Sequence, residues 1–349
     1  MYIGRGQQLR YKEITLLHLI GAVMILLCHF TQKEHLYALG EVFISGVPLF
    51  LFVAGFLAAL KPLPKCSIWI KRKMIRILIP LYLWILPCML MLWLDNHESV
   101  TWTQFLLLIT NMQGLNYIYW KSELHAAVLG LGQLWFTTEI LLCWLLTPFF
   151  ESLIAKCEEH EWNTSKWFLT MSGIILFVQP LLVGCGVQTS YIITYFLGYL
   201  ISRRGIHITN RLLLQVTSGC LAITVVRFIL MCSIDGSMYY DRYIALLSAA
   251  AVGIWVFFFV FWFSYRFSTF TEKLTQTSVI TFFSSISFEI YITHFWFLNG
   301  KWSVANYITN QPVLSDAIVC ALTVLFSYLL HIVSKWGIEM VSSKTKEST

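Results

Sequence analysis

This chain of 349 residues contains few charged residues. Only 12% of its residues are Asp, Glu, Lys or Arg, whereas 58% are hydrophobic. The mean hydropathy is +0.70, far above the values of soluble globular proteins. So few charges exclude an ordinary soluble protein and indicate an integral membrane protein.

The nine cysteines lack any C-x-x-C spacing. Most of them lie in hydrophobic stretches, where a thiol behaves as a small apolar side chain. This pattern indicates neither a disulfide framework nor a metal site. The sequence also lacks internal repeats, low-complexity tracts and a soluble domain, so we expect one membrane domain over residues 1–349.

Hydrophobic stretches long enough to cross about 30 Å of hydrocarbon recur along the whole chain. We therefore predict an all-α, polytopic membrane helix bundle of about ten transmembrane helices. The first could be mistaken for a cleaved signal peptide, but no small-residue cleavage site follows it, so we expect it to be retained. The predicted spans are 14–31, 42–60, 76–94, 131–150, 167–183, 190–202, 211–233, 243–264, 279–299 and 314–334.

The distribution of Lys and Arg predicts the orientation, because cytoplasmic loops of membrane proteins retain positive charge. With both termini in the cytoplasm, 19 of the 24 basic residues lie on the inner side, four lie in outer loops and Arg227 lies inside a span. The inner residues include the dense cluster Lys71, Arg72, Lys73 and Arg76. The net charge of +6 therefore reflects membrane topology, and we expect no nucleic-acid partner.

The longest connection, residues 95–130, is predicted on the outer side and is rich in aromatic and amide residues. Such a segment suits an aromatic belt at the membrane interface, with a short amphipathic helix. It also suits a lip on which the faces of a sugar stack, although the composition favours the belt. The residues concerned are Trp102, Asn111, Gln113, Asn116, Tyr117, Tyr119 and Trp120.

Ionisable side chains inside a bilayer are costly and usually face a bundle interior or a wet cavity, so each one is a functional candidate. His18 and His29 project from one face of the first span, because eleven residues exceed three helical turns by only about 20°. They are about 16 Å apart along the helix axis. Their shared face indicates a common polar track, although either histidine alone also suits a structural role. The full set is His18, His29, Glu139, Arg227, Glu289 and His294.

Ser287, Tyr291 and His294 share a face as well, at positions i, i+4 and i+7. If 279–299 is one helix that starts inside, His294 lies about 22 Å along it, a depth similar to that of His29. The two imidazoles would then be able to meet. Tyr291 and His294 also suit a structural pair. Glu139 must be protonated or paired, which suits a proton relay and a structural role equally well.

These features, in this order, resemble the membrane-bound acyltransferase family 3, whose members acylate glycans and other acceptors across the membrane. The resemblance covers about residues 10–340. It rests on Cys28-His29-Phe30, PLFLFVAGFL at 48–57, IKRKMIRILIPLYLW at 70–84, Leu134-Trp135-Phe136 followed by Pro148, and the spacing of Ser287, Tyr291 and His294. Thr31-Gln32 and Gly46-Val47-Pro48 also resemble a subgroup, the membrane protein of intercellular-adhesin polysaccharide synthesis.

The sequence departs from the family pattern at two positions. His18 stands where the family commonly has Arg, eleven residues before the histidine of the first span. Glu139 is four residues after Trp135, whereas many members have an acidic residue five after this Trp. The departures leave the details of donor binding and the role of Glu139 open.

The resemblance implies a multi-pass enzyme of the cell membrane that transfers an acetyl or succinyl group from cytoplasmic acyl-CoA. The acceptor would be a hydroxyl of an extracytoplasmic or lipid-linked glycan, and no cofactor would be bound. His29 would act as general base or carry a transient acyl group, because a histidine titrates near neutral pH. The other expected catalytic residues are His294 and Glu139. The donor would be bound by His18, Arg72 and Arg76, and the acceptor by Trp135 and Tyr291.

Two readings from other classes remain. A polysaccharide exporter or other transporter also needs ionisable groups at mid-membrane, although transporters often have internal repeats that are missing here. A membrane module that serves another catalytic domain is a further alternative, but the chain ends 15 residues after the last predicted span. Turnover of acyl-CoA separates the enzyme from both.

Overall fold

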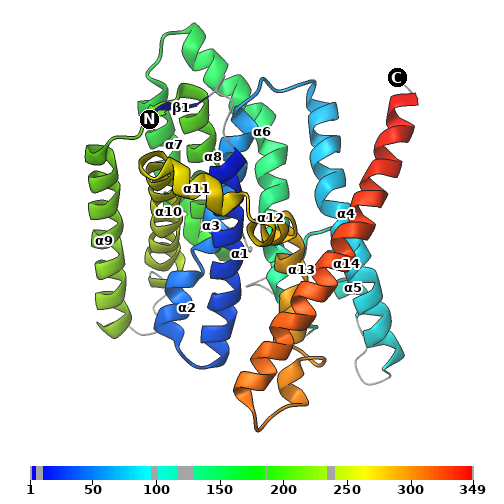
Figure 1. Ribbon diagram of the computed structural model, residues 1–349. Coiled ribbons are helices and arrows are strands. Elements are labelled where there is room, and N and C mark those ends of the chain that lie inside the picture. Colours follow the sequence, from blue (N-terminus) through cyan, green and yellow to red (C-terminus); the bar gives the residue numbers. More distant parts are fainter. Residues whose placement is uncertain are drawn as a thin grey trace. The chain divides into compact units, whose positions relative to one another are not determined.

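The computed structural model is almost entirely helical (Figure 1). It describes residues 2–4, 11–95, 101–116, 129–184, 187–233 and 240–347. The chain divides into two compact units. Unit 1 is Met1–Pro64 with Leu142–Ser285, and unit 2 is Lys65–Leu141 with Ile286–Thr349. The expectation of one domain over the whole chain stays a prediction.

Unit 1 is a helical bundle to which two short strands are added. The strands β1 (Tyr2–Ile3) and β2 (Ile206–His207) pair antiparallel. A π-helical turn, Tyr240–Ala245, precedes α10. The helices are α1 (Tyr11–Lys33), α2 (Tyr37–Phe43), α3 (Gly46–Ala59), α7 (Thr164–Gly184), α8 (Thr189–Arg204), α9 (Asn210–Ser233), α10 (Leu246–Arg266), α11 (Ser268–Thr275) and α12 (Ser278–Ser285), together with the later part of α6 (Trp135–Glu159).

Helix α3 packs against α1, α8 and α10 and so forms the centre of unit 1. A Cβ added to Gly55 would lie 1.9 Å from the carbonyl oxygen of Tyr195 in α8, and one added to Gly198 would lie 2.3 Å from that of Phe52 in α3. Small residues that let two backbones approach are typical of helix packing in membranes. The glycine of the 48–57 segment therefore has a packing role.

In its described residues, unit 2 contains the remaining helices and three short 3₁₀ turns. Helix α13 packs against α14 and α4, and α5 is the short helix expected in the outer connection. Thr101 and Gln104 begin α5 with a capping box, in which each side chain accepts a hydrogen bond from the other's backbone N–H. The elements are α4 (Cys66–Leu94), α5 (Trp102–Ile109), η1 (Gln113–Asn116), η3 (Gly132–Leu134), the first part of α6, α13 (Ser287–Leu298), η5 (Val304–Asn306) and α14 (Pro312–Glu347).

Seven helices among the described residues are long and apolar enough to cross a membrane. They agree with an all-α membrane bundle, but the predicted count of ten and the orientation of the termini are not confirmed. The predicted spans 167–183, 190–202 and 279–299 are not among the seven. The seven are Lys12–Lys33, Tyr37–Ala59, Cys66–Leu94, Gly132–Glu159, Asn210–Cys232, Tyr243–Arg266 and Pro312–Ser342.

The prediction of one continuous helix over 279–299 is wrong, because α12 ends at Ser285 and α13 begins at Ser287. The Ser285 hydroxyl donates to the carbonyl oxygen of Phe282 at 2.7 Å. Serine hydroxyls that bond the backbone of the preceding turn compete with the helical hydrogen bonds. The estimate that His294 lies about 22 Å along one helix therefore no longer applies.

Candidate functional site

Helix α1 carries both histidines of the predicted polar track. It runs without interruption from Tyr11 to Lys33, so the helical geometry that gives His18 and His29 a common face is present. The ring of His18 lies 6.2 Å, between centroids, from that of Phe50 in α3. Both histidines are partly exposed.

Gln32 lies one turn after His29 and contacts the ring of that histidine. The Nδ1 atom of His29 lies 3.1 Å from Oε1 of Gln32. Because an amide oxygen only accepts, this contact requires the hydrogen on Nδ1, and in the neutral imidazole the lone pair then lies on Nε2. Gln32 itself is held by α2, since a Cβ on Gly40 would lie 3.0 Å from its Cγ. The i, i+3 spacing of His29 and Gln32 is the sequence signal for this pair, which was not assigned a role from sequence.

Arg227, the arginine expected inside a span, forms an ion pair with Glu41 of α2. Its Nη1 also donates to the backbone carbonyl oxygen of Glu41 at 2.9 Å, and the side chain is only 3% exposed. A buried arginine that is paired in this way has its charge compensated. Arg227 is therefore accounted for by the contact between α9 and α2.

His294 lies in unit 2, on a helix that is buried from Glu289 to Leu298. Its Nδ1 lies 3.0 Å from the carbonyl oxygen of Ile290 and 2.9 Å from that of Tyr291. Both partners only accept, so Nδ1 carries the hydrogen and Nε2 has the lone pair. His29 belongs to unit 1, so a meeting of the two imidazoles stays a prediction.

Two hydrogen bonds join α13 to the turn before α6. The Tyr291 hydroxyl donates to the carbonyl oxygen of Gln133, and the Nε2 of Gln133 donates to that of Ile292 at 2.6 Å. Phe136 packs edge-on against the ring of Tyr291, with centroids 5.1 Å apart. Gln133 is 2% exposed and has no predicted role from sequence, because 158 residues separate it from Tyr291.

Two polar pairs hold the other face of α13 against α14. Glu289 and His331 approach to 2.9 Å, and the hydroxyls of Thr293 and Ser327 lie 2.8 Å apart. The partners are four residues apart on each helix and run in opposite directions, so they form a two-rung antiparallel ladder. The ladder fixes the rotation of α13 and therefore the direction of Tyr291 and His294.

A buried amide and hydroxyl network precedes Glu139. The Thr137 hydroxyl lies 2.5 Å from Oδ1 of Asn111, and Nε2 of Gln113 donates to Thr137 at 3.0 Å. Asn111 has a positive φ of 55°, which Asn tolerates better than most residues. The network holds the start of α6, where Glu139 is buried and Trp135 is partly exposed. Asn111 and Gln113 are therefore core residues and cannot line an open sugar lip.

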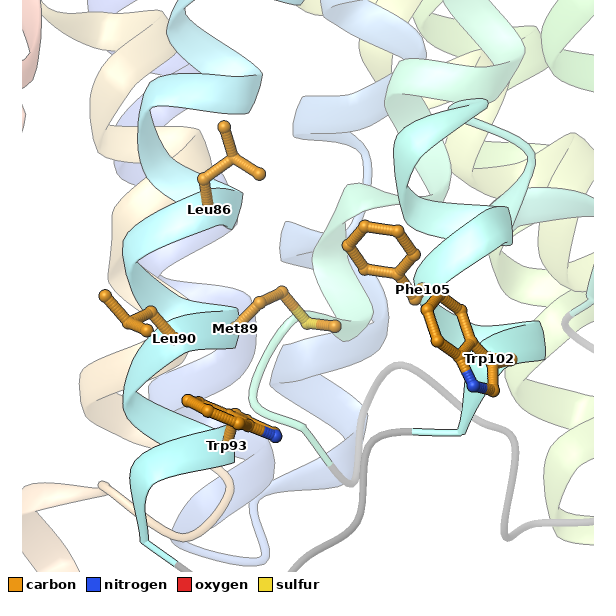
Figure 2. A pocket seen from close by; sticks show the side chains of 6 residues that line it. All are labelled: Leu86, Met89, Leu90, Trp93, Trp102 and Phe105. Atoms are coloured by element: carbon orange, nitrogen blue, oxygen red, sulfur yellow. The ribbon is translucent and has the colours of Figure 1, made fainter.

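Trp102 and Phe105 of the 95–130 connection help to line a hollow of about 400 Å³ between α4 and α5. Figure 2 shows Met89 and Trp93 of α4 facing Phe105 and Trp102 of α5. Trp102 is 80% exposed, which agrees with an aromatic residue at a membrane interface. Tyr117, Tyr119 and Trp120 lie outside the described residues.

The predicted donor-binding arginines lie on the first turns of α4. Arg72 and Arg76 are exposed, whereas Lys73 is partly buried with its Nζ 5.6 Å from the centroid of the Trp69 ring. This contact is a cation–π interaction that suits anchoring of α4. Joint action of these arginines with His18 involves both units and stays a prediction.

A family model described as an acyltransferase domain, that of acyltransferase family 3, matches residues 11–332. Comparison with curated proteins and with solved structures gave no match. The matched range includes α1 with His29 and α13 with His294, and it confirms the resemblance read from the sequence motifs. The chain is an acyltransferase and a multi-pass membrane protein, and it belongs to acyltransferase family 3.

Proposed function

We propose that this protein is an O-acyltransferase of the cell membrane. It moves an acetyl or succinyl group from cytoplasmic acyl-CoA to a hydroxyl of an extracytoplasmic or lipid-linked glycan. The observation that carries the proposal is the state of His29, because its Nδ1 is engaged by Gln32 and the lone pair lies on Nε2. A neutral imidazole in this tautomer suits a general base.

His29 acts on the acceptor hydroxyl. Its Nε2 takes the hydroxyl proton while the acceptor oxygen bonds to the carbonyl carbon of the thioester. The C–S bond then breaks, and the sulfur of CoA takes the proton from the imidazolium. In a second route, Nε2 first accepts the acyl group and then passes it to the hydroxyl.

His294 and Glu139 accept and donate protons in this scheme. Glu139 is buried near the start of α6, and His294 is buried on α13. Trp135 contacts the acceptor with its partly exposed indole. The hydroxyl of Tyr291 is engaged by Gln133, so its part in acceptor binding is to hold α13 in place. Arg72 and Arg76 bind the phosphates of the donor, for which a guanidinium is suited by its paired N–H groups, and His18 lines the donor path.

The test measures acyl-CoA consumption by the purified full-length protein, with glycan extracted from a strain that lacks the gene. We expect release of free CoA and a mass increase of the glycan by one acetyl or succinyl group, both lost in His29→Gln. Gln276→Leu, an exposed position in unit 1, is the matched control. Glycans that are identical in producing and deleted strains, with no turnover of acyl-CoA, would exclude acyl transfer and favour the exporter.

A further inference from the structure

An open groove runs along the first half of α4, with Val341 of α14 at its side. The two helices lie side by side in Figure 1. They touch near Ile79, because a Cβ on Gly337 of α14 would lie 3.2 Å from Cγ2 of Ile79. From there to the start of α4 runs a groove of about 450 Å³. Its main lining residues are Ile70, Lys71, Met74, Ile75 and Leu78 of α4 and Val341 of α14.

The lining residues of α4 follow one helical face, since they recur at intervals of three and four. Ser67 lies at one end of this face and Leu78 near the other. Eleven residues of helix are about 16 Å long, which is roughly half of a hydrocarbon core of about 30 Å. The groove therefore has the length of a fatty acyl chain in one leaflet.

Lys71 is the one cation among the lining residues that the structure describes. Its side chain is exposed, near the start of α4. The hydroxyl of Tyr82, at the far end, is already used as a donor to the carbonyl oxygen of Ile109. The groove thus offers a hydrocarbon surface with a positive charge near one end.

A bound acyl-CoA fits this surface poorly. Its pantetheine arm has two amides and a hydroxyl, and each buried polar group needs a hydrogen-bond partner. Apart from Lys71, the lining near the open end offers only the Ser67 hydroxyl. A phospholipid with a net negative charge needs one cation for its phosphate and an apolar wall for its chain. A zwitterionic phospholipid brings its own cation and gains less from Lys71.

We infer that this groove is a binding site for an anionic phospholipid, with one acyl chain along α4 and the phosphate on Nζ of Lys71. The predicted orientation puts the site in the cytoplasmic leaflet, where anionic lipids attract the basic segments of membrane proteins. A lipid there bridges α4 and α14, and α14 in turn holds α13 through the Glu289–His331 and Thr293–Ser327 pairs. Binding therefore stabilises unit 2.

The experiment uses full-length protein in detergent, to which phosphatidylglycerol or phosphatidylcholine is added. We expect phosphatidylglycerol to raise the Tm by several degrees more than phosphatidylcholine, since a ligand that binds only the folded state stabilises it. Lys71→Gln should weaken phosphatidylglycerol binding about tenfold, as read by native mass spectrometry. Ile75→Trp, which fills the groove, should weaken both lipids.

Lys65→Gln is the matched control, because Lys65 is an exposed cation just before α4 that does not line the groove. It should keep the preference for phosphatidylglycerol. If Lys71→Gln and Lys65→Gln weaken phosphatidylglycerol binding equally, general surface charge explains the effect and the proposed site is wrong. Equal stabilisation by both lipids would also contradict the site, and displacement of phosphatidylglycerol by acetyl-CoA would assign the groove to the donor.

Discussion

Gln133→Leu should lower turnover while leaving the protein folded. The change removes the hydrogen bond from Nε2 to Ile292, which is worth about 0.5–1.5 kcal/mol. It also removes Oε1, which is buried and has no hydrogen-bond partner among the described residues, and relief of such an atom gains about 1–3 kcal/mol. The two effects offset each other, so the free energy of unfolding should change little.

The effect on turnover has a different origin. Without this bond, the turn before α6 holds α13 only through the Tyr291 hydroxyl, so Ile292 and, two residues on, His294 are restrained less firmly. A displacement of about 1 Å in a catalytic group can cost about 10²-fold in rate. We expect kcat to fall about 10- to 100-fold, with KM for acyl-CoA unchanged.

Tyr291→Phe supplies the second side of a double-mutant cycle. It removes the bond from the Tyr291 hydroxyl to the carbonyl oxygen of Gln133. This oxygen still accepts a hydrogen bond from the backbone N–H of Trp135. The cost in unfolding free energy should therefore be only about 1 kcal/mol. Because both bonds join the same two segments, the effects of the two changes on kcat should not multiply.

Steady-state kinetics and thermal unfolding of both single variants and the double variant provide the measurement. Gln276→Leu, far along the chain and exposed, controls for the loss of an amide. If Gln133→Leu keeps kcat within about twofold of the wild type, or if the two effects multiply, the contact does not position His294 and the reasoning fails.

Four further outcomes are expected. His29→Ala should lower acyl transfer about 10²- to 10⁴-fold at equal protein level, and near-normal transfer would make this imidazole structural. Arg76→Ala should raise KM for acyl-CoA about 10- to 150-fold, which corresponds to about 1.5–3 kcal/mol for a charge-assisted bond, whereas an unchanged KM would make the residue an anchor. Gly55→Ala should destabilise unit 1 by about 1–3 kcal/mol in thermal unfolding, because the added Cβ would overlap the backbone of α8. Gly219→Ala is the control, since no atom lies within 4 Å of the added Cβ there. Equal Tm values of the two variants would contradict the packing role of Gly55. A Cys introduced at Lys65 should not react with a membrane-impermeant reagent in intact cells, because this loop is predicted to be cytoplasmic. Labelling of this Cys would contradict the predicted orientation.

Local patterns predicted much of the fold. The apolar run with His18 and His29 is one helix, as its length and hydropathy indicate. Seven of the predicted spans coincide with helices that are long and apolar enough to cross a membrane, but the same patterns joined 279–299 into one helix. Hydropathy could not show that error, because the apolar run continues across Ile286, where α12 gives way to α13.

The candidate site was less predictable, because its contacts join residues that are distant in the chain. Gln133 meets Tyr291 across 158 residues, and no periodicity in the sequence carries that information. Glu289 was recognised as an intramembrane acid, but its partner His331 was not. Gln32 is the exception, since its spacing from His29 is local and could have been used.

The pair of Arg227 and Glu41 has a consequence for how the chain enters the membrane. A lone arginine within a spanning helix opposes insertion by about 2.5–3.5 kcal/mol. Glu41 is synthesised 186 residues earlier, so an acid in α2 is in place before α9 emerges. Helix α9 then enters the membrane with its arginine paired to Glu41, so it exposes no isolated charge to lipid. The order of synthesis, acid before base, makes α2 an assembly partner for α9, and removal of the Glu41 carboxylate should leave α9 slower to insert.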